Sequence, residues 1–179
     1  MKLHSTESLL EYGLEAKREH RLKHARSLFR KALDESRSSE DRELRARLYV
    51  ELAYIELGLG ELEHARTHYL KAAEIHRELG HVLRSVHAAR HAADILREQG
   101  KGEEAGQLYS EVLETYRASS DASRLDLANA IRGLALLKTQ MGAGGEARAL
   151  WEEARDLYRS EDIPAGVEEC TRQIASLGS

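Results

Sequence analysis

The sequence predicts an all-α protein, a solenoid in which a helical hairpin of about 40 residues occurs four times and a last helix follows. Ala, Leu, Glu and Arg dominate the chain, and apolar residues recur at steps of three and four, as on one face of a helix. An alanine also recurs at intervals of 40, 40 and 42 residues, followed each time by an aromatic residue four positions later. These pairs are Ala25 and Phe29, Ala65 and Tyr69, Ala105 and Tyr109, and Ala147 and Trp151.

The four hairpins are expected at about residues 5–37, 40–78, 81–118 and 122–160. In the last three, the turn between the helices carries Gly60, Gly100 or Gly142, and glycine tolerates the left-handed backbone at which a helix ends. His20 holds this place in the first hairpin, so we expect a less relaxed turn there. Each first helix has a small residue at the matching position, which lets the second helix pack closely. These residues are Gly13, Ala53, Ala93 and Ala135.

A last helix is expected at about residues 163–177, where Pro164 suits a first helical turn. Its apolar stripe consists of Val167, Cys170, Ile174 and Leu177. Its outward face consists of Glu168, Glu169, Arg172 and Gln173. A helix with one apolar face covers the open end of a repeat array. We therefore expect residues 1–179 to form a single domain that ends in this capping helix.

Composition limits the classes of partner and location. The 179 residues carry a net charge of −4 with both signs interspersed, so no basic block points to nucleic acid. No run approaches the roughly 20 apolar residues of a membrane span, and the polar first residues lack the apolar stretch of a secretion signal. We expect a cytoplasmic protein without a membrane partner. Cys170 is the only cysteine, which excludes an intrachain disulfide, and its place in the apolar stripe predicts a buried, inert thiol.

The repeated positions carry a family resemblance over roughly residues 5–160. The alanine and aromatic pairs, the turn glycines and strings such as Glu103-Glu104-Ala105 resemble the tetratricopeptide repeat (TPR) family. Because the spacing exceeds the usual 34 residues of that family, the chain looks like the longer-repeat type of kinesin light chain and bacterial regulatory TPR proteins. The resemblance implies an α-α superhelix of four TPR-like hairpins plus a C-terminal capping helix. It also implies a concave groove lined by the first helix of each hairpin.

The same resemblance implies a non-enzymatic scaffold that binds a protein or peptide segment in this groove. The expected groove residues are Lys17, Arg47, Val50, Tyr54, His87, Arg90, Asp94, Arg97, Asn129 and Arg132. Cations outnumber acids among them, and the first half of the groove is more apolar, so we expect acidic segments with a hydrophobic anchor. The alternative is a regulatory or sensory module that binds a small anionic ligand or nucleic acid through the groove arginines.

The N-terminal hairpin has no covering helix of its own. Leu3, Leu9 and Leu10 are therefore expected to remain available on it. A homo-oligomer formed through this uncapped hairpin is a further hypothesis.

Three histidine pairs stand four residues apart and share a helix face: His20 with His24, His64 with His68, and His87 with His91. The last pair and Asp94 offer the donor types of a transition-metal site. The string between these histidines lacks the glutamate of a metalloprotease helix, however, and Arg90 would repel a cation. We expect no metal, no cofactor and no catalytic residue, and metal-dependent melting would test the histidine pairs.

Overall fold

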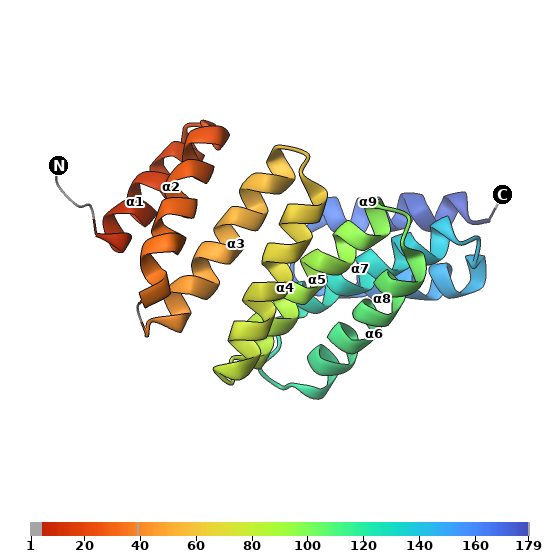
Figure 1. Ribbon diagram of the computed structural model, residues 1–179. Coiled ribbons are helices and arrows are strands. Elements are labelled where there is room, and N and C mark those ends of the chain that lie inside the picture. The colour runs from red at the N-terminus through yellow and green to blue at the C-terminus, as the bar shows by residue number, and fades with distance from the viewer. Residues whose placement is uncertain (1–4, 39, 179) are drawn as a thin grey trace. The chain divides into compact units, whose positions relative to one another are not determined.

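The computed structural model describes residues 5–38 and 40–178, and in them it contains helices and turns but no strand. The helices, labelled in Figure 1, are α1 (Thr6–Arg18), α2 (Leu22–Glu35), the short 3-10 helix η1 (Ser36–Ser38), α3 (Arg42–Gly58), α4 (Leu62–Glu78), α5 (Val82–Glu98), α6 (Gly102–Ala118), α7 (Arg124–Gln140), α8 (Gly144–Ser160) and α9 (Pro164–Ser176). This order confirms the predicted all-α solenoid of hairpins followed by a last helix. Within the described residues, no helix is long and apolar enough to cross a membrane.

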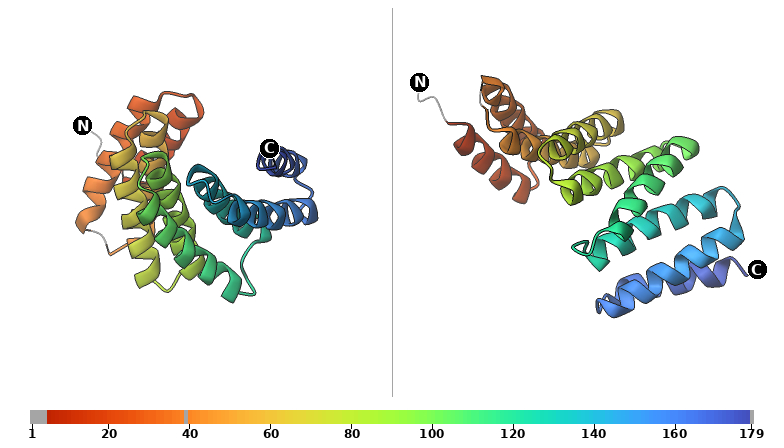
Figure 2. Two further views of the ribbon diagram at one scale, coloured as in Figure 1. Left: turned by 90° about the vertical axis from the view of Figure 1, so that its right-hand side faces the viewer. Right: turned by 90° about the horizontal axis from the view of Figure 1, so that it is seen from below.

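Contacts divide the chain within α5 into two compact units, one up to Ala92 and one from Ala93 onward. In the first unit, α1 packs on α2 and α3 packs on α4. In the second unit, α7 packs on α8, and α9 packs on α8 in turn. Figure 2 shows these pairs as antiparallel helices joined by short turns. The pairs α1–α2, α3–α4 and α7–α8 lie within three of the expected hairpins, while the hairpin bounds and the single domain over residues 1–179 stay predictions.

The turns between helices have the left-handed backbone that the sequence predicts. Gly60, Gly100 and Gly142 have φ angles of 76°, 75° and 74°. His20 occupies the same region at 56°, which confirms the less relaxed first turn because a side chain at positive φ is strained. Two further left-handed positions, Gly80 and Asp162, end α4 and α8 and were not predicted.

The repeated aromatic residues form the core, as expected. Phe29, Tyr109 and Trp151 are fully buried, and Tyr69 is 3% exposed. In the first unit, Phe29 belongs to an apolar cluster that includes Leu48 and other residues of α1 to α3. Burial of such side chains is the main favourable term in folding, so the repeated pattern specifies the scaffold.

Three glycines lie directly against aromatic rings. A Cβ atom added to Gly13 would lie 2.3 Å from Cε1 of Phe29, and one added to Gly133 would lie 2.6 Å from Cε1 of Tyr109. A Cβ atom on Gly166 would lie 2.5 Å from Cγ of Tyr158. The sequence identified Gly13 as a close-packing position, and Ala135, its predicted equivalent in the fourth hairpin, is fully buried. It did not identify Gly133 and Gly166, which pack on an aromatic residue of the preceding hairpin.

The last helix packs on α8, and of its predicted stripe Cys170 is buried, while Val167, Ile174 and Leu177 are half-buried. Cys170 is fully buried, and burial raises the pKa of its thiol to about 11, with the nearby Glu169 carboxylate adding to the rise. The thiol is therefore protonated at neutral pH. The expectation that Glu169 faces outward is wrong, because its carboxylate accepts two hydrogen bonds from Arg132 of α7.

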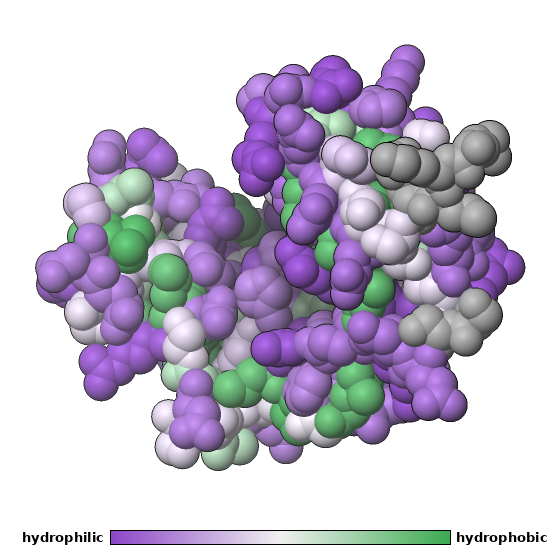
Figure 3. Space-filling view, turned by 90° about the vertical axis from the view of Figure 1, so that its left-hand side faces the viewer, coloured by the Kyte–Doolittle hydropathy of each residue, from purple (hydrophilic) through white to green (hydrophobic). Residues whose placement is uncertain are grey.

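The N-terminal hairpin differs from expectation in what it exposes. Leu9 and Leu10 are 1% and 5% exposed, because they pack in the apolar cluster around Phe29, so the expectation that they stay available is wrong. Leu3 lies outside the described residues. Hydrophilic side chains cover most of the face seen in Figure 3, and hydrophobic ones occur there in small separate groups. The homo-oligomer stays a prediction that these two leucines do not support.

Candidate binding surface

Three of the expected groove residues follow one side of α3. Arg47, Val50 and Tyr54 stand three and four residues apart, so they share a helix face. The helix begins where the side chain of Asp41 accepts a hydrogen bond from the backbone of Leu44 at 2.9 Å, a side-chain cap. Arg47 is exposed, Val50 is half-buried and the Tyr54 side chain is 54% exposed. The repeated aromatics are buried, whereas Tyr54, which is not one of them, presents its ring at the surface.

A hollow of about 610 Å³ lies beside the first half of this helix face. Arg47 and Val50 line it together with Asp41, Glu43, Leu44, His76 and Arg84. Sequence reasoning missed the last five. Their positions in the repeat could have identified them. The start of α3 and the start of α5 are equivalent positions of consecutive hairpins, and the turn after α4 precedes α5. Charged residues at these two helix starts line the same hollow.

Beyond the hollow, Lys17 of α1 lies over the ring of Tyr54, with its ammonium 4.5 Å from the ring centroid. The same ammonium lies 2.6 Å from Oε2 of Glu51, an acid that the groove list did not include. Arg47, by contrast, makes no ion pair with the residues that the structure describes. An exposed aromatic ring and an arginine that is not neutralised thus lie on the same helix face.

The expected groove residues of α5 in the first unit form a cluster of rings and one cation. Arg90 donates a hydrogen bond of 2.8 Å to Nε2 of His91, and the His91 ring stacks on Tyr69 at 4.8 Å between centroids. The exposed His87 meets the same ring edge-on at 5.1 Å. Burial, with smaller contributions from the charges of Arg90 and His87, lowers the pKa of His91 to about 3. Arg90 thus occupies one of the two nitrogens through which His91 could bind a metal.

The expected groove residues of the second unit are engaged by their neighbours. The Tyr109 hydroxyl donates to Oδ1 of Asp94 at 2.5 Å, and the Tyr158 hydroxyl donates to Oδ1 of Asn129 at 2.8 Å. Burial raises the pKa of Tyr109, and the charge of Asp94 adds to this effect.

The two arginines of this unit also have acids close by. Arg132 makes its paired hydrogen bonds to Glu169 at 2.7 and 2.8 Å. Arg97 has a side chain only 12% exposed and lies 3.5 Å from Glu98. The positive charge counted from the sequence is therefore partly offset by acids outside the expected groove.

The pair His64 and His68 belongs to a network of ion pairs on α4. Nδ1 of His68 lies 2.6 Å from Oε2 of Glu56, a fully buried carboxylate that Arg30 contacts at 3.1 Å through the other oxygen. His64 lies 3.2 Å from Glu61. The pKa of Glu61 is lowered chiefly by its hydrogen bond from Arg26. These contacts give the pair a structural role.

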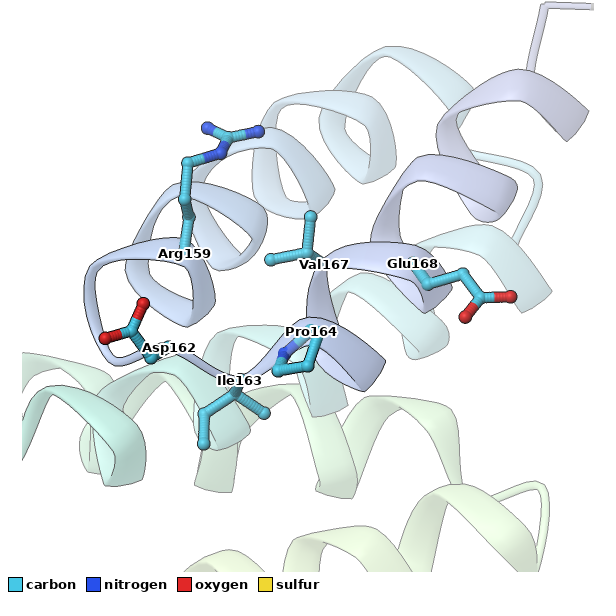
Figure 4. Close-up of a pocket in the computed structure, with 6 residues that line it drawn as sticks. All are labelled: Arg159, Asp162, Ile163, Pro164, Val167 and Glu168. Atoms are coloured by element: carbon cyan, nitrogen blue, oxygen red, sulfur yellow. The ribbon is translucent and has the colours of Figure 1, made fainter.

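A second hollow, of about 520 Å³, lies where α8 meets α9 in the second unit. Figure 4 shows the residues that line it: Arg159, Asp162, Ile163, Pro164, Val167 and Glu168. Three of them are apolar and come from the start of the last helix and the residue before it. The hollow contains none of the expected groove residues.

Comparison with known proteins adds a family match. The sequence model of the family SNAP, soluble NSF attachment protein, matches residues 1–179. None of the curated protein sequences compared with the chain matches it.

Three solved structures are similar in fold. BtubC (BKLC) from P. vanneervenii is 20% identical, with a TM-score of 0.71 over 97% of this chain and 81% of BtubC. The apo form of RapI is 16% identical, with a TM-score of 0.86 over 96% of this chain and 63% of RapI. A Rap protein complexed with Competence and Sporulation Factor is 15% identical, with a TM-score of 0.75 over 99% of this chain and 49% of Rap.

The chain thus spans less than two thirds of the length of either Rap protein. At these identities the likeness concerns the fold, which consists of TPR-like helical repeats.

Proposed function

The chain belongs to the SNAP family of soluble NSF attachment proteins, and from this premise we propose that it is a non-enzymatic scaffold that binds a protein or peptide segment. The family name describes attachment to another protein. The fold neighbour Rap is complexed with Competence and Sporulation Factor, so this kind of helical repeat carries a binding site in at least one relative in fold.

The observation that carries the proposal is the exposed face of α3. Tyr54 presents more than half of its side chain, Val50 adds apolar surface, and Arg47 adds a charge that no described residue neutralises. Tyrosine and arginine are the residue types that contribute most to binding energy at protein interfaces. The hollow beside them is large enough for side chains of a bound segment.

We further propose that the bound segment has a hydrophobic anchor and an acidic residue. The anchor would pack on Tyr54 and Val50, and the acidic residue would pair with Arg47. Lys17, His87 and Arg90 complete the proposed groove in the first unit. Asp94, Arg97, Asn129 and Arg132 stay candidate binding residues of the second unit. The alternative, a small anionic ligand or nucleic acid bound through arginines, is less favoured, because the acids Asp41 and Glu43 line the same hollow as Arg47 and Arg84.

The repeat type, the source and the location of the protein are also part of this proposal. The repeat interval of about 40 residues supports the longer-repeat type that resembles kinesin light chain and bacterial regulatory TPR proteins. A bacterial, cytoplasmic protein fits that type. These assignments rest on the resemblance and not on the geometry of α3.

A library of fluorescent peptides tests the binding mode. We expect peptides with one bulky apolar residue and neighbouring acids to raise the fluorescence anisotropy when the full chain is added. The double substitution Arg47→Glu with Tyr54→Ala should weaken this binding by at least about tenfold, as loss of an interface hot spot does. The matched control, Arg172→Glu with Tyr12→Ala, changes the same residue types on α9 and α1. Equal binding by both variants would refute the proposed surface.

A further inference from the structure

Three potential metal ligands converge at one end of the hollow in the first unit. Glu43 lies in the first turn of α3, His76 in the last turn of α4, and His81 in the turn before α5. Nδ1 of His81 lies 3.0 Å from Oε2 of Glu43, and Nδ1 of His76 lies 4.0 Å from the same oxygen. All three ligand atoms lie within 4.8 Å of one another. They come from three segments that the fold brings together.

Two of these atoms are buried without a hydrogen bond. The His76 side chain is 8% exposed, and neither its Nδ1 nor Oε2 of Glu43 has a hydrogen-bond partner among the described residues. Buried polar atoms in native proteins are normally paired, since an unpaired one loses its hydration without compensation. Two such atoms 4.0 Å apart, beside a third nitrogen, need a common partner.

We propose that Glu43, His76 and His81 form a zinc-binding site. Two imidazoles and one carboxylate are a donor set that binds zinc and leaves the fourth position open. A tetrahedral zinc ion with bonds of about 2.0–2.1 Å holds its ligand atoms roughly 3.3 Å apart. Closing the 4.0 Å separation to that value needs a side-chain movement of less than about 1 Å. The fourth position would open toward the hollow.

The neighbouring groups suit this role. Arg84 donates to Oε1 of Glu43, which orients the carboxylate and leaves Oε2 for the ion. Asp41 lines the same hollow and offsets the charge of Arg84. His76 itself comes from the last turn of α4 with its side chain almost wholly buried, so its ring is held in place at the site.

The other histidines fit a metal less well. His64, Glu56 and Glu61 also lie close together, but Arg26 contacts one of the two acids and Arg30 the other. In the pair His87 and His91, Arg90 donates to Nε2 of His91. No metal site is predicted here from the sequence, because the histidines considered there are those spaced four residues apart on one helix. His76 and His81 stand five residues apart across the left-handed Gly80, so their convergence is a property of the turn.

Bound zinc would tie the start of α3 to the turn between α4 and α5 within the first unit. The proposal does not depend on the peptide-binding function. If the α3 face binds no segment, the three ligands and their distances are unchanged.

Calorimetric titration of the full chain with zinc chloride tests the site. We expect one zinc ion per chain, and at least about tenfold weaker binding after His81→Gln, which removes a half-exposed ligand. His76→Gln and Glu43→Gln should act in the same way. His87→Gln, which changes an exposed histidine outside the site, should bind zinc as tightly as the unchanged chain. Zinc at a hundredfold excess over its Kd should also raise Tm by roughly 5–10 °C.

Two results would overturn the proposal. One is the absence of saturable zinc binding to the unchanged chain. The other is zinc binding that His81→Gln leaves as tight as before. Because His81 is not part of the core, its variant decides the question even if His76→Gln fails to fold. The visible spectrum of bound Co²⁺ gives a second readout, and it should change with His81→Gln and not with His87→Gln.

Discussion

At the scale of single residues, strain and close contact are concentrated at a few positions. His20 adopts the left-handed backbone for which the other three hairpins have glycine. Gly133 allows the ring of Tyr109 to lie where a Cβ atom would otherwise be. His91 is held neutral by burial and by Arg90. Each of these positions makes a separate prediction about stability.

Replacing His20 with glycine should stabilise the protein. Glycine removes the penalty of a side chain at positive φ, and part of this gain is lost to the entropy of the unfolded chain, so we expect about 0.5–1 kcal/mol. Chemical denaturation measures the free energy of unfolding. The control His24→Gly lies within α2, where glycine should destabilise by about 1 kcal/mol. A loss of stability with His20→Gly would contradict the account of the first turn.

Gly133→Ala should destabilise the second unit by about 1–3 kcal/mol, because the new methyl group overlaps the Tyr109 ring and forces it to move. Thermal melting followed by circular dichroism measures this effect. Gly106→Ala is the matched control, since its Cβ would make only an ordinary contact of 3.5 Å with Leu137. That substitution should be neutral or stabilising. Equal effects of the two substitutions would show that the close contact with Tyr109 is unimportant.

The stability should also depend on pH through His91. Its folded-state pKa of about 3 lies below the ordinary value, so the unfolded chain binds one more proton than the folded chain between these values. Stability is therefore present above the unfolded pKa and is lost as the pH falls below it. From pH 7 to pH 5 we expect the His91 contribution to fall by roughly 2 kcal/mol. In His91→Gln this part of the slope should disappear, whereas the exposed His24→Gln should retain it.

At the scale of helices, α9 is held by both its apolar stripe and an ion pair. The Arg132 and Glu169 side chains are 38% and 24% exposed, so solvent screens their attraction in part. Glu169→Ala should lower the local stability of α9 by about 1 kcal/mol, seen as faster amide hydrogen exchange in Pro164–Ser176. Glu168→Ala, which changes an acid 78% exposed on the next position, is the control. Unchanged exchange with Glu169→Ala would leave the apolar stripe as the only attachment.

The helices themselves could be predicted from sequence, because each depends on local signals. Periodic apolar residues, a turn glycine and a proline at a first turn fix where helices such as α4 and α9 begin and end. Contacts between neighbouring hairpins could not be predicted, because they depend on how helices cross. The contact of Gly133 with Tyr109, the pairing of Glu169 with Arg132, and the convergence of Glu43 with His81 are all of this kind.

The candidate site was predicted only in part, because some of its residues follow from local spacing and others from contacts between hairpins. Matching positions on the first helix of each hairpin identified Arg47, Val50 and Tyr54, which do share a face of α3. Register within one hairpin did not reveal that Glu51 pairs with Lys17, so the positive charge of the groove was overcounted. The net charge of the groove would have been estimated correctly if acids at matching positions of the adjacent hairpin, such as Glu51, had been included.

At the scale of the whole molecule, the protein is a SNAP-family chain of TPR-like repeats in two compact units. Its repeated residues are buried and specify the scaffold. The residues that differ between repeats are the ones that reach the surface, and Tyr54 and Arg47 are the clearest examples. The proposed function therefore depends on a few unlike side chains that a regular scaffold presents.

Affinity capture from the native cell extract tests this central proposal most directly. The full chain, the double variant Arg47→Glu with Tyr54→Ala, and the control Arg172→Glu with Tyr12→Ala would be used as bait in parallel, after their melting curves are shown to match. We predict that the unchanged chain and the control enrich the same partner and that the double variant loses it. Enrichment of that partner by all three baits would contradict binding through the exposed face of α3.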